Sequence, residues 1–181
     1  QSFENSMAAN RIQIGEQETN GLGAGSNPEV GQKSAEENLD SIMEAVSDAN
    51  MVFITAGMGG GTGTGATPVI AKSAKESGIL TVGVVTTPFM FEGNKRQRTS
   101  KKGIEELRNF VDTILVIPNE KLIEFAGSAF ASEAFQMTDT VLLQAVQGIA
   151  DLITKPGQIN IDFADVCTVM RNKGEALIGF G

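Results

Sequence analysis

A run of glycine and threonine is the part of this sequence best suited to chemistry, because it could bind phosphate. The run consists of Gly59, Gly60, Gly61, Thr62, Gly63, Thr64 and Gly65, and it follows an apolar stretch at residues 51–56. Glycine lets the backbone approach a phosphate closely and adopt positive φ, so that successive N–H groups can point at the anion. Pro68 is expected in the opening turn of the helix that follows, whose N-terminus would add partial positive charge.

The run differs from two common phosphate-binding motifs. It lacks the Gly-Lys-Ser/Thr ending of a Walker A loop, and no three of its glycines fit the G-x-G-x-x-G spacing of a dinucleotide site. A tight turn between a strand and a helix would also use glycine, although one or two glycines suffice for a turn. The run therefore predicts a phosphate-binding loop of another kind, with a simple turn as the alternative.

A second glycine-rich segment precedes another predicted helix. It contains Gly23, Ala24, Gly25 and Asn27, and Asn27 is suited to the N-cap position of that helix. Alone, the segment could be no more than a capped loop. If both glycine segments lie at one edge of a sheet, they would hold the phosphates of one mononucleotide from two sides.

Three polar residues near the end of the chain form an N-x-D-x-x-D pattern, namely Asn160, Asp162 and Asp165. They lie at the start of a predicted helix over residues 162–172. Acidic side chains often cap the first turn of a helix, where they accept hydrogen bonds from free N–H groups and suit the helix dipole. Carboxylates can also position a water molecule for attack on phosphorus. The pattern alone leaves both interpretations open.

Composition excludes several other kinds of chemistry. The 181 residues include no His and one Cys, which excludes an imidazole-dependent nucleophile, a zinc knuckle and an internal disulfide. The formal charge of −8 disfavours nucleic acid as the main partner. A basic run with Arg98, Lys101 and Lys102 is expected to be a solvated helix face. The longest charge-free stretch, residues 49–71, contains the glycine run, so insertion into a membrane is not expected.

Short β-rich runs alternate with longer periodic segments, which is typical of parallel strands joined by crossover helices. Strands are expected at residues 11–14, 51–56, 80–86 and 113–117, and helices at residues 28–47, 67–77, 96–110, 120–125, 132–154 and 162–172. The helix over residues 132–154 has little polar face and should be buried on most sides. The predicted fold class is α/β, a Rossmann-like, three-layer parallel sheet with a long buried core helix.

Four motifs resemble those of the tubulin and FtsZ family of GTPases, and they occur along the chain in the same order as in that family. They are residues 59–65, which match the tubulin signature, and residues 21–29, 87–93 and 160–166. The resemblance covers essentially the whole chain and implies a GTPase that polymerises head to tail and forms the cell-division ring. It divides the chain into a partial nucleotide-binding domain (1–131), a central core helix (132–154), and a synergy loop, a helix and the start of a C-terminal domain (155–181). The family's first strand and phosphate loop, and its smaller C-terminal domain, are not expected within these residues.

The resemblance also implies roles for single residues. Besides the glycine segments, which would hold the GTP phosphates, the positions that match nucleotide contacts are Pro88, Glu92, Arg96, Asn119, Phe135 and Asp139. Glu92 and Arg96 would reach the ribose. Asn119, Phe135 and Asp139 would hold guanine, with Phe135 stacking on the base and Asp139 accepting hydrogen bonds from its N–H groups. Without the resemblance, Phe135 could equally be a core residue.

The length of the predicted helix over residues 132–154 indicates where the three polar residues near the end of the chain lie. Ligand loops lie at the carboxyl ends of parallel strands, and Asp139 is expected there. From Asp139 to Thr154 the helix advances about 22 Å, at about 1.5 Å per residue, which would place Asp162 and Asp165 on the opposite face. They could then act only on the nucleotide of a neighbouring copy, in a head-to-tail contact that propagates as a filament. By resemblance they match the synergy loop, which promotes hydrolysis in the adjacent subunit.

The expected cofactors are GTP or GDP with Mg²⁺ bound through the phosphates, and the acids could also help hold a monovalent cation. The expected partners are other copies of the chain and further division proteins, and the expected location is the cytoplasm at the division site or the plastid stroma. Two other functions remain open. One is a nucleotide-binding structural partner that co-assembles without efficient hydrolysis, and the other is a monomeric nucleotide-binding enzyme with an unrelated substrate.

Overall fold

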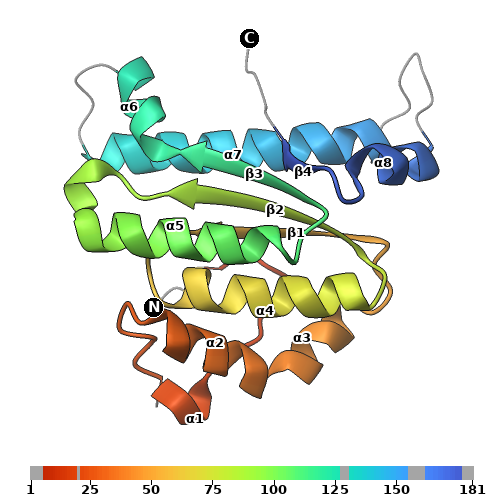
Figure 1. Cartoon of the computed structure of the whole chain (residues 1–181), viewed down its shortest axis with the longest axis horizontal. Coiled ribbons are helices and arrows are strands. Elements are labelled where there is room, and N and C mark those ends of the chain that lie inside the picture. Colours follow the sequence, from red (N-terminus) through yellow and green to blue (C-terminus); the bar gives the residue numbers. More distant parts are fainter. Residues whose placement is uncertain (1–5, 20, 127–130, 155–161, 177–181) are drawn as a thin grey trace.

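Four parallel strands form the centre of the protein in a computed structural model, which describes residues 6–19, 21–126, 131–154 and 162–176. The strands are β1 (Met51–Gly57), β2 (Leu80–Thr87), β3 (Thr113–Pro118) and β4 (Gly174–Ala176). They lie in the order β1-β2-β3-β4, and each pairs in parallel with its neighbour. This arrangement confirms the α/β fold class and three of the four predicted strands (Figure 1).

Helices connect and cover these strands. They are α1 (Glu16–Thr19), α2 (Pro28–Glu37), α3 (Leu39–Ala45), α4 (Thr62–Glu76), a 3-10 turn η1 (Met90–Glu92), α5 (Asn94–Arg108), α6 (Asn119–Ala126), α7 (Ala131–Thr154) and α8 (Phe163–Met170). α4 joins β1 to β2, and α5 joins β2 to β3. These are the crossover connections that parallel pairing requires.

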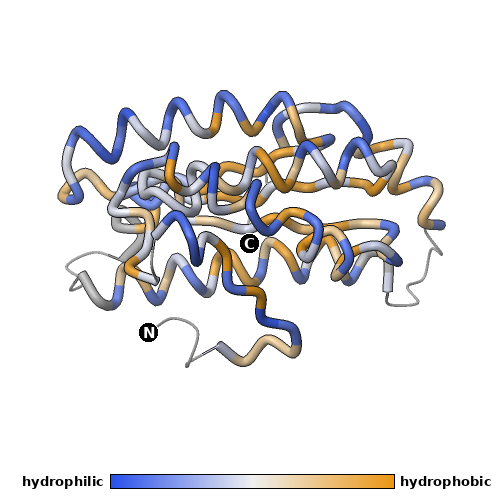
Figure 2. The backbone as a smooth tube through the Cα atoms, turned by 90° about the horizontal axis from the view of Figure 1, so that it is seen from below, coloured by the Kyte–Doolittle hydropathy of each residue, from blue (hydrophilic) through white to orange (hydrophobic). Residues whose placement is uncertain are grey.

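The core has two layers, one on each face of the sheet. α4 and α5 cover one face and α7 covers the other (Figure 1). Side chains alternate between the faces along each strand. On the first face Val85 and Ile114 pack with Leu107 of α5, and on the second face Val84 packs with Ala145 of α7. Hydrophobic residues accordingly concentrate in the interior of the molecule (Figure 2).

α7 begins one residue before the predicted helix and ends where it was expected. Val141 and Ile149 pack toward the strands together with the buried Ala145, whereas Leu143 is 56% exposed. Among its described residues the burial of α7 is therefore one-sided, rather than on most sides. The sheet covers one side of the helix, and α6 also contacts α7, whereas Leu143 remains exposed.

The predicted strand at residues 11–14 is wrong. These residues belong to no strand, although exposed and half-buried residues alternate along them. A strand needs a neighbouring backbone to bond with, and β1 pairs only with β2 in the described part of the chain. β4, by contrast, was not predicted. Its three residues Gly174–Ala176 carry little β propensity, and pairing with β3 defines the strand.

Two predicted helices differ most from the structure. The helix expected at residues 28–47 is divided at Asn38 into α2 and α3. α4 begins at Thr62 instead of residue 67, because the second half of the glycine run is itself helical, and Pro68 lies inside this helix rather than in its opening turn. The proline position removes one backbone donor from the helix interior.

Candidate functional site

A cleft of about 310 Å³ opens where β1, β2 and β3 end. Seven of its lining residues are ones that the sequence predicts to contact nucleotide, namely Gly60, Pro88, Glu92, Arg96, Asn119, Phe135 and Asp139. The sequence analysis missed five others, namely Gly57, Met58, Thr86, Thr138 and Leu142. The first three lie at the ends of β1 and β2, and the other two follow Phe135 at helical spacing. Strand ends and helix periodicity could therefore have identified them.

Asn119 is one of three buried polar residues that line the cleft, together with Thr86 and Thr138. It follows β3 directly as the first residue of α6, and only 4% of its surface is exposed. Its Oδ1 atom is fully buried and has no hydrogen-bond partner among the residues that the structure describes. An unpaired buried acceptor is unfavourable by about 1–3 kcal/mol, so a bound donor group would relieve it. This side chain is therefore the clearest indication that the cleft accommodates a ligand.

Phe135 of α7 gives the cleft a flat apolar wall. Its ring is 45% exposed, and it contacts two other rings of the described part of the chain. Phe89 meets it edge to face, with ring centroids 5.0 Å apart, and Phe91 lies 6.2 Å away. Phe135 is thus a half-exposed ring held from behind, which suits stacking on a planar ligand.

Glu92 and Arg96 form an ion pair at the rim of the cleft. Nη1 of Arg96 lies 2.5 Å from Oε2 of Glu92. Oε1 of Glu92 accepts a hydrogen bond of 2.9 Å from the backbone N–H of Phe89. Both carboxylate oxygens are therefore engaged, which fixes the position of the pair beside the cleft. The remaining N–H groups of the guanidinium can donate to a ligand.

Asp139 lies on α7, one turn after Phe135. Its side chain is exposed, and its carboxylate makes no hydrogen bond or ion pair with any residue that the structure describes. An ionised carboxylate accepts two hydrogen bonds side by side. The cleft thus combines a free carboxylate, an aromatic ring and a buried amide.

The glycine run divides into a short loop and the first turn of α4. Gly59 has φ 107° and donates its N–H to Oγ1 of Thr64, 2.9 Å away, so this N–H is unavailable to a phosphate. Gly60 lines the cleft, and the space beside its Cα is open. The first N–H groups of α4 follow at Thr62, where a helix leaves donors without intrahelical partners. The backbone N–H groups of the run that could bind a phosphate are therefore those of the loop after Gly59 and of the first turn of α4.

The other glycines of the run are explained by packing. A Cβ atom at Gly61 would meet Ala24 and the backbone of Asn27, and one at Gly65 would collide with the carbonyl oxygen of Pro28. A Cβ atom at Gly63 would approach the carbonyl oxygen of Gly57. Gly61 and Gly65 let α2 and the preceding segment lie directly against α4, and Gly63 lets α4 approach the end of β1. Gly61 and Gly65 contribute to the site by bringing the two glycine segments together.

The second glycine segment contacts the first but does not line the cleft. Asn27 caps α2 as predicted, since its Oδ1 accepts a hydrogen bond of 3.0 Å from the N–H of Glu29. Gly23 lines a separate opening of about 590 Å³, together with Thr62 and part of residues 6–21. Gly25 has φ 57° and is exposed. The structure therefore places this segment beside the start of α4 and not beside Asn119, Phe135 and Asp139.

The two described acids of the N-x-D-x-x-D pattern lie at the start of α8, and Asn160 lies outside the described residues. Asp162 occupies the N-cap position, yet its side chain makes no capping hydrogen bond. Asp162 and Asp165 are exposed, and their carboxylates contact no partner in the described part of the chain. The structure therefore offers no capping role that would account for Asp162.

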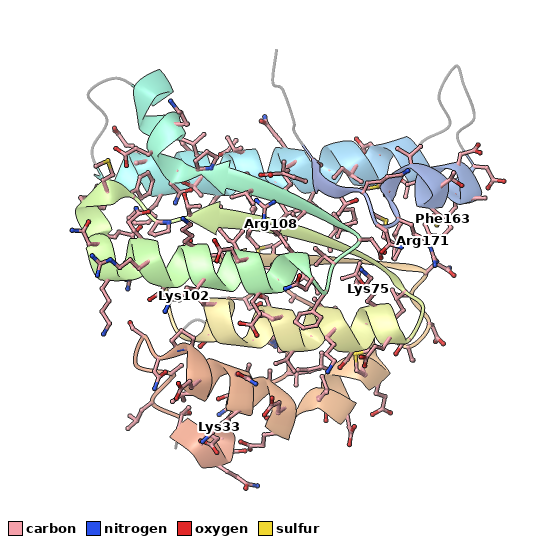
Figure 3. The ribbon with its side chains drawn as sticks, viewed as in Figure 1. Lys33, Lys75, Lys102, Arg108, Phe163 and Arg171 are labelled. Carbon is pink, nitrogen blue, oxygen red and sulfur yellow. The ribbon has the colours of Figure 1, made fainter. Side chains whose placement is uncertain are left out.

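α8 is anchored at the end of the sheet opposite the cleft. Oγ1 of Thr113, the first residue of β3, donates a hydrogen bond of 2.6 Å to the carbonyl oxygen of Met170. Arg171 donates to the carbonyl oxygen of Gly78, just before β2. Figure 1 shows α8 beside the far end of α7, and Figure 3 labels Phe163 and Arg171 at this end. The acids and the cleft of one molecule therefore lie at opposite ends of the sheet.

The described residues contain no group of three or more His, Cys, Asp or Glu side chains arranged to hold a metal ion. They also contain no helix whose length and hydropathy would let it cross a bilayer.

Comparison with known proteins identifies the fold. The Tubulin/FtsZ family, GTPase domain, matches residues 1–127. The solved structure of an empty FtsZ dimer from M. jannaschii has 51% sequence identity and a TM-score of 0.87, covering 90% of this chain and 47% of that one. A W319Y mutant of FtsZ from the same organism has 48% identity and a TM-score of 0.93, covering 96% of this chain and 52% of that one.

A more distant structure shares the fold alone. The GDP-bound monomer of CetZ1 from Haloferax volcanii has 23% identity and a TM-score of 0.75, covering 91% of this chain and 49% of that one. The chain thus spans about half the length of the solved structures that it matches. Its parallel sheet, glycine run and end-of-strand cleft agree with the family match, and the chain belongs to the tubulin/FtsZ family.

Proposed function

We propose that this protein binds GTP and GDP in the cleft and hydrolyses GTP within head-to-tail filaments of identical subunits. The observation that carries most weight is the buried Oδ1 of Asn119, which has no hydrogen-bond partner in the described part of the chain and belongs to a residue that lines the cleft. Guanine has a flat ring and an edge with adjacent N–H donors. Phe135 would stack on the ring, Asp139 would accept two of the donors, and Asn119 would accept another.

The rest of the nucleotide would extend from this base site along the carboxyl ends of the strands. Glu92 and Arg96, which are already paired at the rim, would contact the ribose. Gly60 and the first turn of α4 would face the phosphates, with Ala24 and Asn27 of the second glycine segment behind Gly61. Mg²⁺ would enter with the triphosphate and bridge phosphate oxygens.

Hydrolysis would be completed by the neighbouring subunit. Asp162 and Asp165 would position the water that attacks the γ-phosphate, Asn160 would orient the site, and the acids could help hold a monovalent cation. Phosphoryl transfer depends mainly on positioning and charge stabilisation, so it does not need a histidine. Two features support this role for the acids. Their carboxylates are exposed and without partners in the described chain, and they lie at the end of the sheet opposite the cleft.

The mouth of the cleft also suits contact with another subunit. Met90 and Phe91 follow β2 on η1, and their surfaces are 70% and 58% exposed. Together with Phe135 they place apolar side chains beside the proposed guanine site, at the end that a neighbour's acids would have to cover. Burial of such side chains would favour association. Because the two contacting surfaces differ, repetition of this contact gives an open filament.

Membership of the family supports a role for these filaments in the division ring. The protein would then act in the cytoplasm at the division site, or in the plastid stroma, with other division proteins as partners. Nucleotide binding, filament growth and hydrolysis would form one cycle, because the catalytic groups of one subunit act on the nucleotide of the next.

Phosphate release from GTP tests this proposal, measured against protein concentration in the complete protein that carries this sequence. Activity per subunit should rise steeply above a threshold concentration and then level off, because the site exists only between subunits. Constant activity per subunit at all concentrations would indicate a monomeric enzyme. Filaments that bind GTP without releasing phosphate would indicate a structural co-assembly partner.

A further inference from the structure

We infer that Phe89 is a positioning residue for guanine recognition, because it fixes the ring of Phe135 on which the base would stack. Phe89 is fully buried and does not line the cleft, so a ligand in the cleft cannot touch it. Its effect on binding must therefore pass through Phe135. This inference rests on the proposed function, since it assumes that the cleft binds guanine.

Three phenylalanine rings form one cluster behind the cleft. The edge-to-face contact between Phe89 and Phe135 has a centroid distance of 5.0 Å and an interplanar angle of 87°. Phe89 and Phe91 stack at 5.0 Å with an angle of 9°. The contact between Phe91 and Phe135 is longer, at 6.2 Å. Phe89 is therefore the buried member that touches both other rings closely.

Edge-to-face geometry determines which way the Phe135 ring faces. An aromatic ring has a negative face and a positive edge, so contacts of this kind favour one relative orientation over others. Phe135 is half exposed, and its ring contacts in the described chain come from Phe89 and Phe91. Phe91 is itself more than half exposed, so it is the weaker support. The orientation of Phe135 thus depends chiefly on Phe89.

The loop that carries Phe89 is held by several hydrogen bonds. The N–H of Phe89 donates to Oε1 of Glu92 at 2.9 Å, and the N–H of Glu92 donates back to the carbonyl oxygen of Phe89 at 3.1 Å. One residue earlier, the carbonyl oxygen of Pro88 accepts a hydrogen bond of 2.7 Å from Nε2 of Gln97. The backbone on both sides of the Phe89 side chain is therefore fixed to η1 and α5.

The same carboxylate connects the aromatic cluster to the proposed ribose site. Oε1 of Glu92 holds the backbone of Phe89, and Oε2 is paired with Arg96. The carboxylate of Glu92 thus joins Phe89, which supports the base-stacking ring, to the ribose-contacting pair. A ring that is already oriented loses less entropy when the base binds, which strengthens binding of the base without a new contact.

Comparing the binding of two ligands, one with the base and one without it, distinguishes a positioning role of Phe89 from a general structural role. We would measure the dissociation constants of GTP and of ribose 5′-triphosphate, which lacks the base, for the complete wild-type protein and for Phe89→Leu. The substitution should weaken GTP binding about threefold to tenfold, the range that an aromatic pair contributes. It should leave binding of ribose 5′-triphosphate unchanged. Phe89→Met, which fills a similar volume without a ring, should behave in the same way.

A double-mutant cycle tests whether the effect passes through Phe135. Phe135→Leu should weaken GTP binding, and adding Phe89→Leu to it should cause no further loss, because coupled residues are not additive. Phe110→Leu is the matched control, since Phe110 packs against the core beneath α4 and α5 and does not line the cleft. It should lower the midpoint of thermal unfolding and leave both dissociation constants unchanged.

The outcomes are distinguishable. If the wild-type protein does not bind GTP, the proposed function itself fails. If Phe135→Leu weakens GTP binding and both Phe89 variants bind like the wild type, Phe89 does not position the ring. Equal weakening of GTP and ribose 5′-triphosphate by the Phe89 variants would show a merely structural effect and would also overturn the inference.

Discussion

The guanidinium of Arg171 donates a hydrogen bond to the carbonyl oxygen of Gly78, 3.4 Å away, and thereby ties the end of α8 to the amino end of β2. At the other end of this strand, Thr86 and Pro88 line the cleft. β2 has eight residues, which span about 23 Å at about 3.3 Å per residue. The acids at the start of α8 are therefore about one sheet length from the cleft of their own molecule.

This separation predicts complementation between two inactive variants. In the complete protein, Asp162→Asn should retain GTP binding and lose phosphate release, because its cleft is intact and its acids are not. Asp139→Asn should lose guanine binding while keeping its acids. A mixture of the two should release phosphate, since some junctions then pair an intact cleft with intact acids. Phosphate release by each variant alone and by the mixture is the measurement.

A mixture of two preparations of the same variant provides the control for complementation. Two preparations of Asp162→Asn mixed together should remain inactive, because no subunit supplies the acid. Loss of GTP binding in Asp162→Asn would contradict the role assigned to this residue. An inactive mixture in spite of co-assembly, measured by sedimentation, would contradict a site shared between subunits.

Alanine should destabilise the protein at one glycine of the run and leave its stability nearly unchanged at another. At Gly65 a Cβ atom would collide with the carbonyl oxygen of Pro28, so Gly65→Ala must force α2 and α4 apart. We expect it to lower the free energy of unfolding by about 1–3 kcal/mol, the range for overpacking of a tight contact. At Gly60 the space is open, so Gly60→Ala should change stability by less than about 1 kcal/mol. Denaturant unfolding of both variants is the measurement.

Nucleotide binding by the Gly60 variant adds a second test. Gly60 lines the cleft, so a methyl group there should weaken GTP binding even though the fold is retained. A stable Gly60→Ala protein with unchanged GTP affinity would show that the phosphates do not approach this glycine. A Gly65→Ala protein as stable as the wild type would contradict the packing explanation of the run.

The sequence predicted the parts of the fold whose signal is local. β1, β2 and β3 are apolar because both faces of the sheet are covered, and α7 has a long periodic pattern. Gly60 was found from its glycine run, which follows a predicted strand and precedes a helix, whereas Pro88 and Asn119 were identified only through family resemblance. Phe135 and Asp139 were identified through family resemblance, since a phenylalanine in an apolar helix is otherwise a core candidate.

The sequence failed where structure depends on distant partners. Residues 11–14 have a strand pattern but no neighbouring strand among the described residues, whereas β4 has almost no pattern and forms because β3 is beside it. The start of α4 was also misplaced, since glycines that looked like a loop are required by close contact with α2. The hydrogen bond from Gly59 to Thr64 removes one expected phosphate donor, and no spacing rule reveals it.

The hydrogen bond from Thr113 to Met170 should stabilise α8 against local opening. Oγ1 of Thr113 is largely buried and donates a hydrogen bond of 2.6 Å to the carbonyl oxygen of Met170. Thr113→Val keeps the shape of the side chain and leaves this carbonyl without its donor. We expect a loss of about 1–2 kcal/mol in the free energy of unfolding. Hydrogen exchange should become faster in α8 and remain unchanged in α4, and equal acceleration in both helices would contradict a local anchoring role.

Replacing Asn119 should weaken GTP binding without destabilising the protein. Asn119→Leu keeps the approximate size of the side chain and removes a buried oxygen that has no partner among the described residues, so the free energy of unfolding should stay the same or rise by up to about 1 kcal/mol. GTP binding should weaken at least about tenfold, because a hydrogen-bond acceptor for the base is lost. Asn38→Leu is the matched control, since Oδ1 of Asn38 accepts a hydrogen bond of 2.9 Å from the N–H of Gly15 and its removal should destabilise the fold. If Asn119→Leu instead destabilises the protein as much as Asn38→Leu does, Asn119 has a structural partner, and the main support for a guanine site in this cleft is lost.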